Sequence, residues 1–153
     1  MYYHSYYSYY LCKNSVLQVI ANSLTRFCSN LFVDLPSFAS PCIITGEQER
    51  PDVVIIQQKA VMLSELTIGF ETNMELNSKR KHEKYKDLID RLKKSYDDVI
   101  YANISMSACG FIEKDSKKFL DIMTKLKIPE KEIRYLTKSI INICIRTSYF
   151  TFL

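Results

Sequence analysis

The sequence predicts an α/β fold in which a small mixed sheet with an antiparallel hairpin is flanked by helices. Segments 53–56 and 60–68 are rich in β-branched and aliphatic residues, and the polar turn between them is short enough to make them a hairpin. Helical periodicity precedes this pair and follows it. The 153 residues suffice for one domain with its own core, so we expect no second domain.

The N-terminal segment differs from the rest in composition, because residues 1–10 contain six of the eleven tyrosines. This low-complexity tip, taken as residues 1–13, is predicted to be disordered, with an aromatic stacking platform as the alternative. Residues 14–153 are predicted to form the single α/β domain. Its first helix begins with a capping box at Ser15 and runs, by its apolar spacing, to about Asn30.

An irregular connection is predicted between this helix and the hairpin. Three prolines and a glycine interrupt it, and residues 42–44 could pair briefly as a strand. After the hairpin, a capping box that begins at Thr72 predicts a long helix. A third strand at 99–106 follows, and two final helices, the first capped by Asp115 and the second started by Pro129, complete the predicted order.

Two charged residues interrupt apolar patterns. Side chains alternate between the two faces of a strand, which places Glu65 on an otherwise apolar face of the second hairpin strand. In the long helix, Lys81 lies on the same apolar stripe as Tyr85 and Leu88. A carboxylate is costly in such a place unless it is paired, bound to a metal or set at a cleft. A buried ion pair between Glu65 and Lys81, without catalysis, is the alternative to a catalytic site.

Asp52 and Glu65 are the candidate metal ligands. Asp52 follows Pro51 at the start of the first hairpin strand, and Glu65 lies on the partner strand, so strand pairing can bring the two carboxylates together. Hard oxygen ligands of this kind, with water and phosphate oxygens, are what Mg²⁺ or Mn²⁺ takes. Lys81 would then orient the attacking water or offset charge in the transition state. Without Glu65, Asp52 would be interpreted as a turn residue.

The positive charge of the chain is concentrated in one helix. The formal net charge is +4, whereas segment 79–94 alone carries eight basic and three acidic residues, so the rest of the chain sums to −1. Such a run is usually a solvated helix face, but beside two carboxylates it also suits contact with a nucleic-acid backbone. The five cysteines form no CxxC pair and, with two histidines, show no zinc-site spacing, which favours free thiols.

Six short motifs follow one another along the chain: DLPSFASPCIITG (34–46), RPDVVI (50–55), ELTIGFETN (65–73), RKHEKYKDL (80–88), NISMSACG (103–110) and IRTSYF (145–150). In this order they resemble a domain found at the C-terminal end of invertebrate retroelement reverse-transcriptase polyproteins, over about residues 14–150. Asp52 and Glu65, with the spacing between them, also resemble the PD-(D/E)XK nuclease pattern. The resemblance implies a restriction-endonuclease-like core and a piece of a longer polyprotein, truncated at its N-terminus.

The PD-(D/E)XK pattern has a Lys two residues after the Glu, where this chain has the structural hydroxyl of Thr67. The resemblance implies that the retroelement branch commonly lacks this Lys, so the catalytic Lys has moved or the activity is lost. Lys81 is the first candidate for a migrated Lys and Lys84 the second. Tyr85 matches the Tyr of a helical Gln-xxx-Tyr pair in several branches. Glu71 is a further acidic ligand or an N-terminal charge for the helix.

These features together predict a metal-dependent nuclease domain that hydrolyses DNA phosphodiesters, with Mg²⁺ or Mn²⁺ and no small-molecule cofactor. Phosphate contacts are expected from Arg50, Lys79, Arg80 and Lys84. The alternatives are an inactive nuclease-fold module for DNA binding or polyprotein assembly, and a decayed retroelement fragment. The sequence has no membrane-spanning run and no secretory signal, so we expect an intracellular protein, nuclear or cytoplasmic, without a membrane partner.

Overall fold

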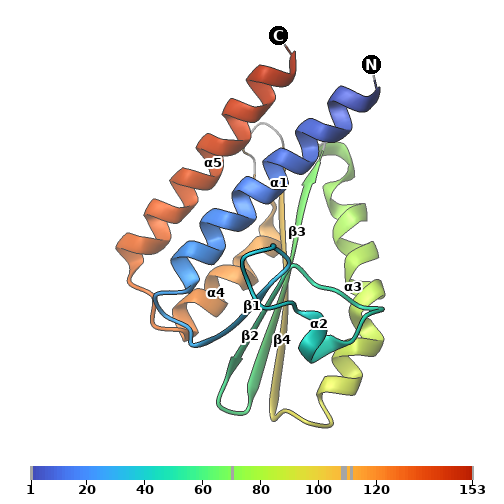
Figure 1. The fold of residues 1–153 in the computed structure, drawn as a ribbon, viewed down its shortest axis with the longest axis vertical. Helices are drawn as coiled ribbons and strands as arrows, with labels where there is room; N and C mark the ends of the chain where they lie inside the picture. Colours follow the sequence, from blue (N-terminus) through green and yellow to red (C-terminus); the bar gives the residue numbers. More distant parts are fainter. Residues whose placement is uncertain (1, 70, 108–109, 111, 153) are drawn as a thin grey trace.

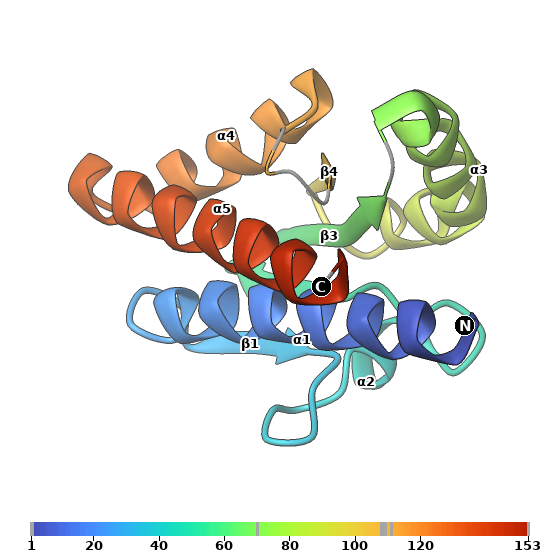
Figure 2. The ribbon, with the colours of Figure 1, turned by 90° about the horizontal axis from the view of Figure 1, so that it is seen from above.

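A four-stranded sheet forms the middle layer of the molecule, with helices on both of its faces (Figures 1 and 2). The computed structural model describes residues 2–69, 71–107, 110 and 112–152. Within these ranges the side chains of 2–8, Glu71, Asp115 and 150–152 lie outside the described set. The mixed α/β class predicted from the sequence is confirmed.

The sheet contains β1 (Asn30–Val33), β2 (Val53–Gln57), β3 (Ala60–Gly69) and β4 (Asp98–Ser107), in the order β1-β2-β3-β4. β1 pairs antiparallel with β2, and β2 pairs antiparallel with β3. β4 runs parallel to β3, which requires a crossover connection, and a long helix supplies it. The antiparallel hairpin and the small mixed sheet predicted from the sequence are therefore confirmed.

The described residues contain five α-helices: α1 (Tyr2–Leu24), α2 (Cys42–Thr45), α3 (Met74–Leu92), α4 (Lys117–Lys125) and α5 (Glu130–Phe152). α3 covers one face of the sheet, whereas α1, α4 and α5 pack on the other. α1 and α5 lie side by side, and the two ends of the chain lie at the same end of the molecule (Figures 1 and 2). None of these helices is both long and apolar enough to span a membrane.

Alternation along β3 sends its side chains into two separate hydrophobic cores. Met62 and Leu66 belong to the core formed with α1, α4 and α5. Leu63 belongs to the smaller core formed with α3, where it packs with Leu88. The next side chain after Leu63 on the α3 face is Glu65, as the two-residue period predicts. A carboxylate is thus placed at the border of an apolar layer.

The N-terminal helix is longer than the sequence predicted. α1 begins at Tyr2 instead of Ser15, and it ends at Leu24 instead of near Asn30. Neither Gly nor Pro interrupts the residues before Ser15, so the helix can propagate through the Tyr-rich segment at the gain of one hydrogen bond per residue. The capping box at Ser15 is therefore wrong, whereas the division of the chain after residue 13 stays a prediction.

Four further local predictions need correction. Asn30–Val33 forms an edge strand, because its backbone pairs with β2, although no strand was expected there. Residues 42–44 lie in α2, a single helical turn, and not in a strand. Thr72 does not start α3, because Asn73 precedes the first helical residue and makes no side-chain cap. The cap predicted at Asp115 is wrong, because Ser116 is the N-cap residue of α4 and Asp115 lies in the 3₁₀ turn before it.

Packing of α3 on the sheet depends on Leu88, which is fully buried, whereas Leu76 of the same helix is exposed. We expect Leu88→Ala to lower the free energy of unfolding by about 2–5 kcal/mol, because it leaves a cavity between α3 and the sheet. Leu76→Ala, the matched control, should change it by less than about 0.5 kcal/mol. Urea denaturation followed by circular dichroism measures both values, and equal losses would contradict this packing.

Candidate functional site

Asp52 and Glu65 meet where β2 begins. Val53 pairs with Ser64, so the register continues to Asp52 opposite Glu65. The Asp52 backbone N–H donates a hydrogen bond to Glu65 Oε2 at 3.2 Å, and the Leu66 backbone N–H donates one to Asp52 Oδ2 at 2.8 Å. The two acidic residues are only 4% and 3% exposed. The structure thus brings both predicted carboxylates to one buried place.

Helix α3 presents Lys81 and Tyr85 to Glu65. Four residues separate these two side chains, so both project from the same side of the helix, one turn apart. The Lys81 ammonium group forms an ion pair and hydrogen bond with Glu65 Oε1. The Tyr85 hydroxyl lies 3.0 Å from Glu65 Oε2 and 3.0 Å from the Arg50 carbonyl oxygen, and it can donate its single proton to either. Lys81 therefore faces the sheet, as its position in the apolar stripe predicted.

Lys13 is a member of the site that the sequence reasoning missed. Its ammonium group lies 3.0 Å from Asp52 Oδ1, and it comes from α1, in the helical layer opposite α3. Lys13 precedes Val16, Leu17 and Ile20 by three, four and seven residues, so it lies on the buried face of α1. A charged residue in an apolar stripe could have indicated this role. Lys13 was not considered, because the helix was predicted to begin at Ser15, after it.

Burial and mutual repulsion govern the protonation of this cluster. Burial, followed by the Glu65 carboxylate, raises the pKa of Asp52 to about 6, although Lys13 and the Leu66 N–H act in the opposite direction. Burial is also the largest effect on Lys13 and favours its neutral form, yet the two carboxylates outweigh it and raise the pKa of Lys13. Burial and then Glu65 raise the pKa of Tyr85 far above its ordinary value, so its phenol stays protonated.

The two carboxylates suit a hard divalent cation in their chemistry. Mg²⁺ usually takes one or two protein carboxylates and fills its other positions with water or phosphate oxygens. The raised pKa of Asp52 comes first from burial and then from repulsion by Glu65, and a cation bound beside both carboxylates would lower it. No group of three or more His, Cys, Asp or Glu side chains in the described part of the chain is arranged to hold a metal ion. Asp52 and Glu65 are the two acidic side chains that meet in the described site.

The other predicted site residues differ in their contacts and in their exposure. Lys84 donates a hydrogen bond to the Tyr85 hydroxyl at 3.2 Å and lies over the Tyr85 ring. Arg50 forms an ion pair with Asp34 at 2.6 Å. Thr67 is buried on the α3 face, two residues beyond Glu65. Two predicted phosphate ligands, Lys79 and Arg80, are exposed, and the Glu71 side chain lies outside the described residues.

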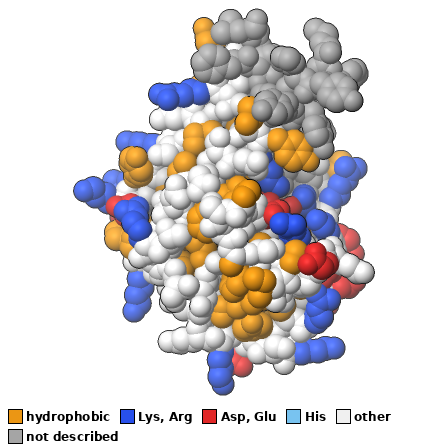
Figure 3. All heavy atoms as spheres, viewed as in Figure 1, with side chains coloured by type: hydrophobic (Ala, Val, Ile, Leu, Met, Phe, Trp, Pro, Cys, Tyr) orange, Lys and Arg blue, Asp and Glu red, His pale blue; other side chains and the backbone are white. Residues whose placement is uncertain are grey.

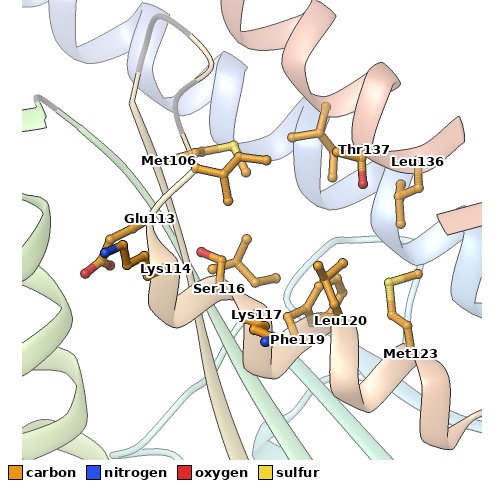
Figure 4. Close-up of a pocket in the computed structure, with 13 residues that line it drawn as sticks. Met106, Glu113, Lys114, Ser116, Lys117, Phe119, Leu120, Met123, Leu136 and Thr137 are labelled. Atoms are coloured by element: carbon orange, nitrogen blue, oxygen red, sulfur yellow. The ribbon is translucent and has the colours of Figure 1, made fainter. Parts of the chain in front are cut away.

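A cavity lies on the other face of the sheet. Figure 4 shows a cavity of about 370 Å³ between β4, α4 and α5, lined mostly by apolar side chains such as Phe119 and Met123. Ile104 lines it from β4, and this side chain belongs to the core opposite α3. The cavity is therefore separate from Asp52 and Glu65, and the sequence carried no motif that pointed to it.

No protein-family model and no curated protein matches the chain. Solved structures of viral proteins do match it. One, described as a Phenuiviridae cap-snatching endonuclease, is 15% identical with a TM-score of 0.39, over 69% of this chain and 61% of that one. Two others, from Toscana virus cap-snatching endonucleases, are 14% and 15% identical with TM-scores of 0.39, over 69% and 71% of this chain. The chain spans 64% of the length of each of these two.

The pKa of Asp52 gives a pH dependence that can be measured. Because its value of about 6 in the fold exceeds the ordinary 3.8, the stability that protonated Asp52 contributes is fully present below about pH 4 and is lost as the pH rises through about 6. As the pH rises across this range, we expect the free energy of unfolding of Asp52→Asn to increase by roughly 2–3 kcal/mol relative to that of the wild type.

Urea denaturation at a series of pH values, with EDTA present, measures this difference. Asp97→Asn, a substitution at an exposed carboxylate, is the matched control and should follow the wild type at every pH. A difference between Asp52→Asn and the wild type that stays constant with pH would refute the assignment of this titration to Asp52.

Proposed function

We propose that the chain is a metal-dependent nuclease domain of retroelement origin that hydrolyses DNA phosphodiesters. The observation that carries this proposal is the buried Asp52–Glu65 pair, with one ammonium group on each carboxylate. Two paired acidic residues beside a Lys, on a small mixed sheet flanked by helices, are what the resemblance to PD-(D/E)XK nucleases implies. The six motifs in their order support the retroelement origin.

Each residue of the cluster has a role in this proposal. Asp52 and Glu65 would hold Mg²⁺ or Mn²⁺, which supplies an activated water and offsets phosphate charge when it is bound. Lys81 supplies positive charge next to Glu65, where it can orient the attacking water or stabilise the charge that develops on the phosphate. Tyr85, which stays protonated, fixes the orientation of the Glu65 carboxylate. Lys13 holds the Asp52 carboxylate in the same manner.

The basic surface of α3 would hold the DNA backbone. Lys79, Arg80 and Lys84 are exposed on the helix that also carries Lys81. Lys and Arg side chains project from the edge of the molecule at which Figure 1 places α3, as Figure 3 shows. Binding of this kind neutralises phosphates and releases counterions, so it does not depend on base sequence. Arg50, which is half-exposed beside Asp34, would add a further phosphate contact.

One observation favours the alternative of an inactive module. Both carboxylates already have an ammonium partner, and Thr67 stands where the nuclease pattern has its Lys. A buried pair of this kind can be retained for specificity of folding alone. In that case the chain would bind DNA or assemble with the rest of a polyprotein without cleaving, or it would be a decayed fragment.

Plasmid cleavage in the presence of Mn²⁺ tests the catalytic proposal. We expect the wild type to cleave, and the cleavage rates of Glu65→Gln and Lys81→Met to fall roughly a hundredfold or more, because the first removes a proposed metal ligand and the second removes positive charge beside the phosphate. Lys86→Met, an exposed substitution on the same helix outside the proposed phosphate contacts, is the matched control and should stay close to the wild type. If the wild type binds plasmid but cleaves no faster than Glu65→Gln, the catalytic proposal fails and the inactive module stands.

The salt dependence of DNA binding tests the role of the basic helix. We expect a variant with three Gln substitutions on α3 to bind less tightly, and the slope of log affinity against log salt to decrease by about 0.9 for each phosphate that the variant no longer neutralises. A control variant carries three Gln substitutions at exposed lysines of the opposite layer and should keep the wild-type slope. The α3 variant is substituted at Lys79, Arg80 and Lys84. The control variant is substituted at Lys114, Lys117 and Lys118. Equal slopes in both variants would contradict an α3 interface.

A further inference from the structure

Three buried oxygen atoms near Glu65 have no hydrogen-bond partner among the described residues. They are Thr67 Oγ1, the Tyr101 hydroxyl and Asn103 Oδ1. The parallel register sets Asn103 opposite Glu65 and Tyr101 opposite Leu63, while Thr67 follows Glu65 by two residues on β3. Alternation along the strands therefore places all three side chains on the α3 face, at or next to the register position of Glu65.

Asn103 is the most informative of the three residues, because it lies directly across from Glu65 on the neighbouring strand. It is 1% exposed, and its Nδ2 donates a hydrogen bond to Ser105 Oγ at 2.8 Å. This bond leaves Oδ1 as a buried acceptor without a donor. A buried acceptor without a partner is destabilising, so a side chain held in this state indicates a missing partner.

The chemistry of the neighbours restricts what this partner is. An ionised carboxylate and an amide oxygen are both acceptors only, so Glu65 cannot satisfy Asn103 Oδ1 directly. The shared partner has to be a donor, such as water, or a cation that accepts oxygen ligands. Divalent cations such as Mg²⁺ take neutral amide oxygens together with carboxylates and water. Asn103 belongs to the NISMSACG motif, for which the proposed nuclease reaction has no role so far.

We propose that Asn103 Oδ1 is the third protein oxygen ligand of the divalent cation that Asp52 and Glu65 hold. This inference rests on the proposed function, because it concerns the same cation. Asn103 contributes a neutral oxygen from β4, so the cation is bound from β2, β3 and β4 without a third negative charge. The hydroxyls of Thr67 and Tyr101, which both donate and accept, are suited to hold the water that a small hard cation retains.

Mn²⁺ binding, measured by calorimetry and by the electron paramagnetic resonance signal of free Mn²⁺, tests the inference without any need for cleavage. We expect Asn103→Leu to weaken Mn²⁺ binding roughly tenfold or more. Ser64→Ala is the matched control, because Ser64 Oγ is likewise buried and without a partner but belongs to the opposite face of β3. This control should bind Mn²⁺ like the wild type.

A direct spectroscopic test uses Asn103→Cys and Cd²⁺. A thiolate prefers softer metals, so a cysteine at a ligand position should raise Cd²⁺ affinity relative to Mn²⁺ and give a Cd²⁺–thiolate absorption band in the ultraviolet. Ser64→Cys, on the opposite face, should give no band beyond the wild type. Asn103→Cys keeps the test decisive if Asn103→Leu does not fold, because the cysteine side chain is smaller than that of leucine and fits the space of Asn103.

The outcomes separate the inference from the proposed function. If Glu65→Gln loses Mn²⁺ binding while Asn103→Leu keeps the wild-type affinity, the inference is overturned and the cation site of Asp52 and Glu65 stands. The absence of a Cd²⁺–thiolate band in folded Asn103→Cys overturns the inference in the same way. If the wild type itself binds no Mn²⁺, the cation site and the inference fail together.

Discussion

The burial of the Glu65 carboxylate is the constraint on which the rest of the site depends. A charged carboxylate inside an apolar layer is strongly destabilising unless both oxygen atoms have partners. Lys81 binds Oε1, while the Tyr85 hydroxyl and the Asp52 backbone N–H lie against Oε2. These partners come from α3 and from the start of β2, so the docking of the helix and the entry into the hairpin both depend on this one carboxylate.

The same constraint connects the two helical layers. Lys81 reaches the acidic pair from α3, and Lys13 reaches it from α1, which packs on the other face of the sheet. The cluster therefore lies where side chains of both layers meet around the start of β2. Because each ammonium group holds a different carboxylate, the positions of Asp52 and Glu65 are fixed by separate parts of the fold. An arrangement of this kind preorganises acidic side chains that would otherwise repel one another.

The site residues that could be predicted from the sequence were charged residues that interrupt the apolar pattern of a strand or a helix. Glu65 broke the alternation of β3 and Lys81 broke the stripe of α3, so both could be placed beside each other before the structure was known. Lys13 broke a stripe in the same way, but the Tyr-rich composition before it concealed the helix. β1 was missed because a short edge strand is stabilised by its pairing with β2, and that partner is distant in sequence. Asn103 could not be interpreted, because its meaning depends on which residue faces it across β4 and β3.

The two lysines of the cluster, Lys13 and Lys81, are more exposed than the carboxylates with which they form ion pairs. The carboxylates are buried, whereas the side chains of Lys13 and Lys81 are 19% and 30% exposed, so both lysine side chains reach the surface of the molecule in part. Lysine side chains commonly bury their aliphatic stems along apolar surface and keep the charged head in water. Burial, the largest cause of the raised pKa of Asp52, makes this carboxylate depend on a cationic partner, a role that Lys13 fills. In the nuclease that we propose, a divalent cation would compete with these ammonium groups for the two carboxylates, and the lysine would come from α3 because the strand position holds Thr67.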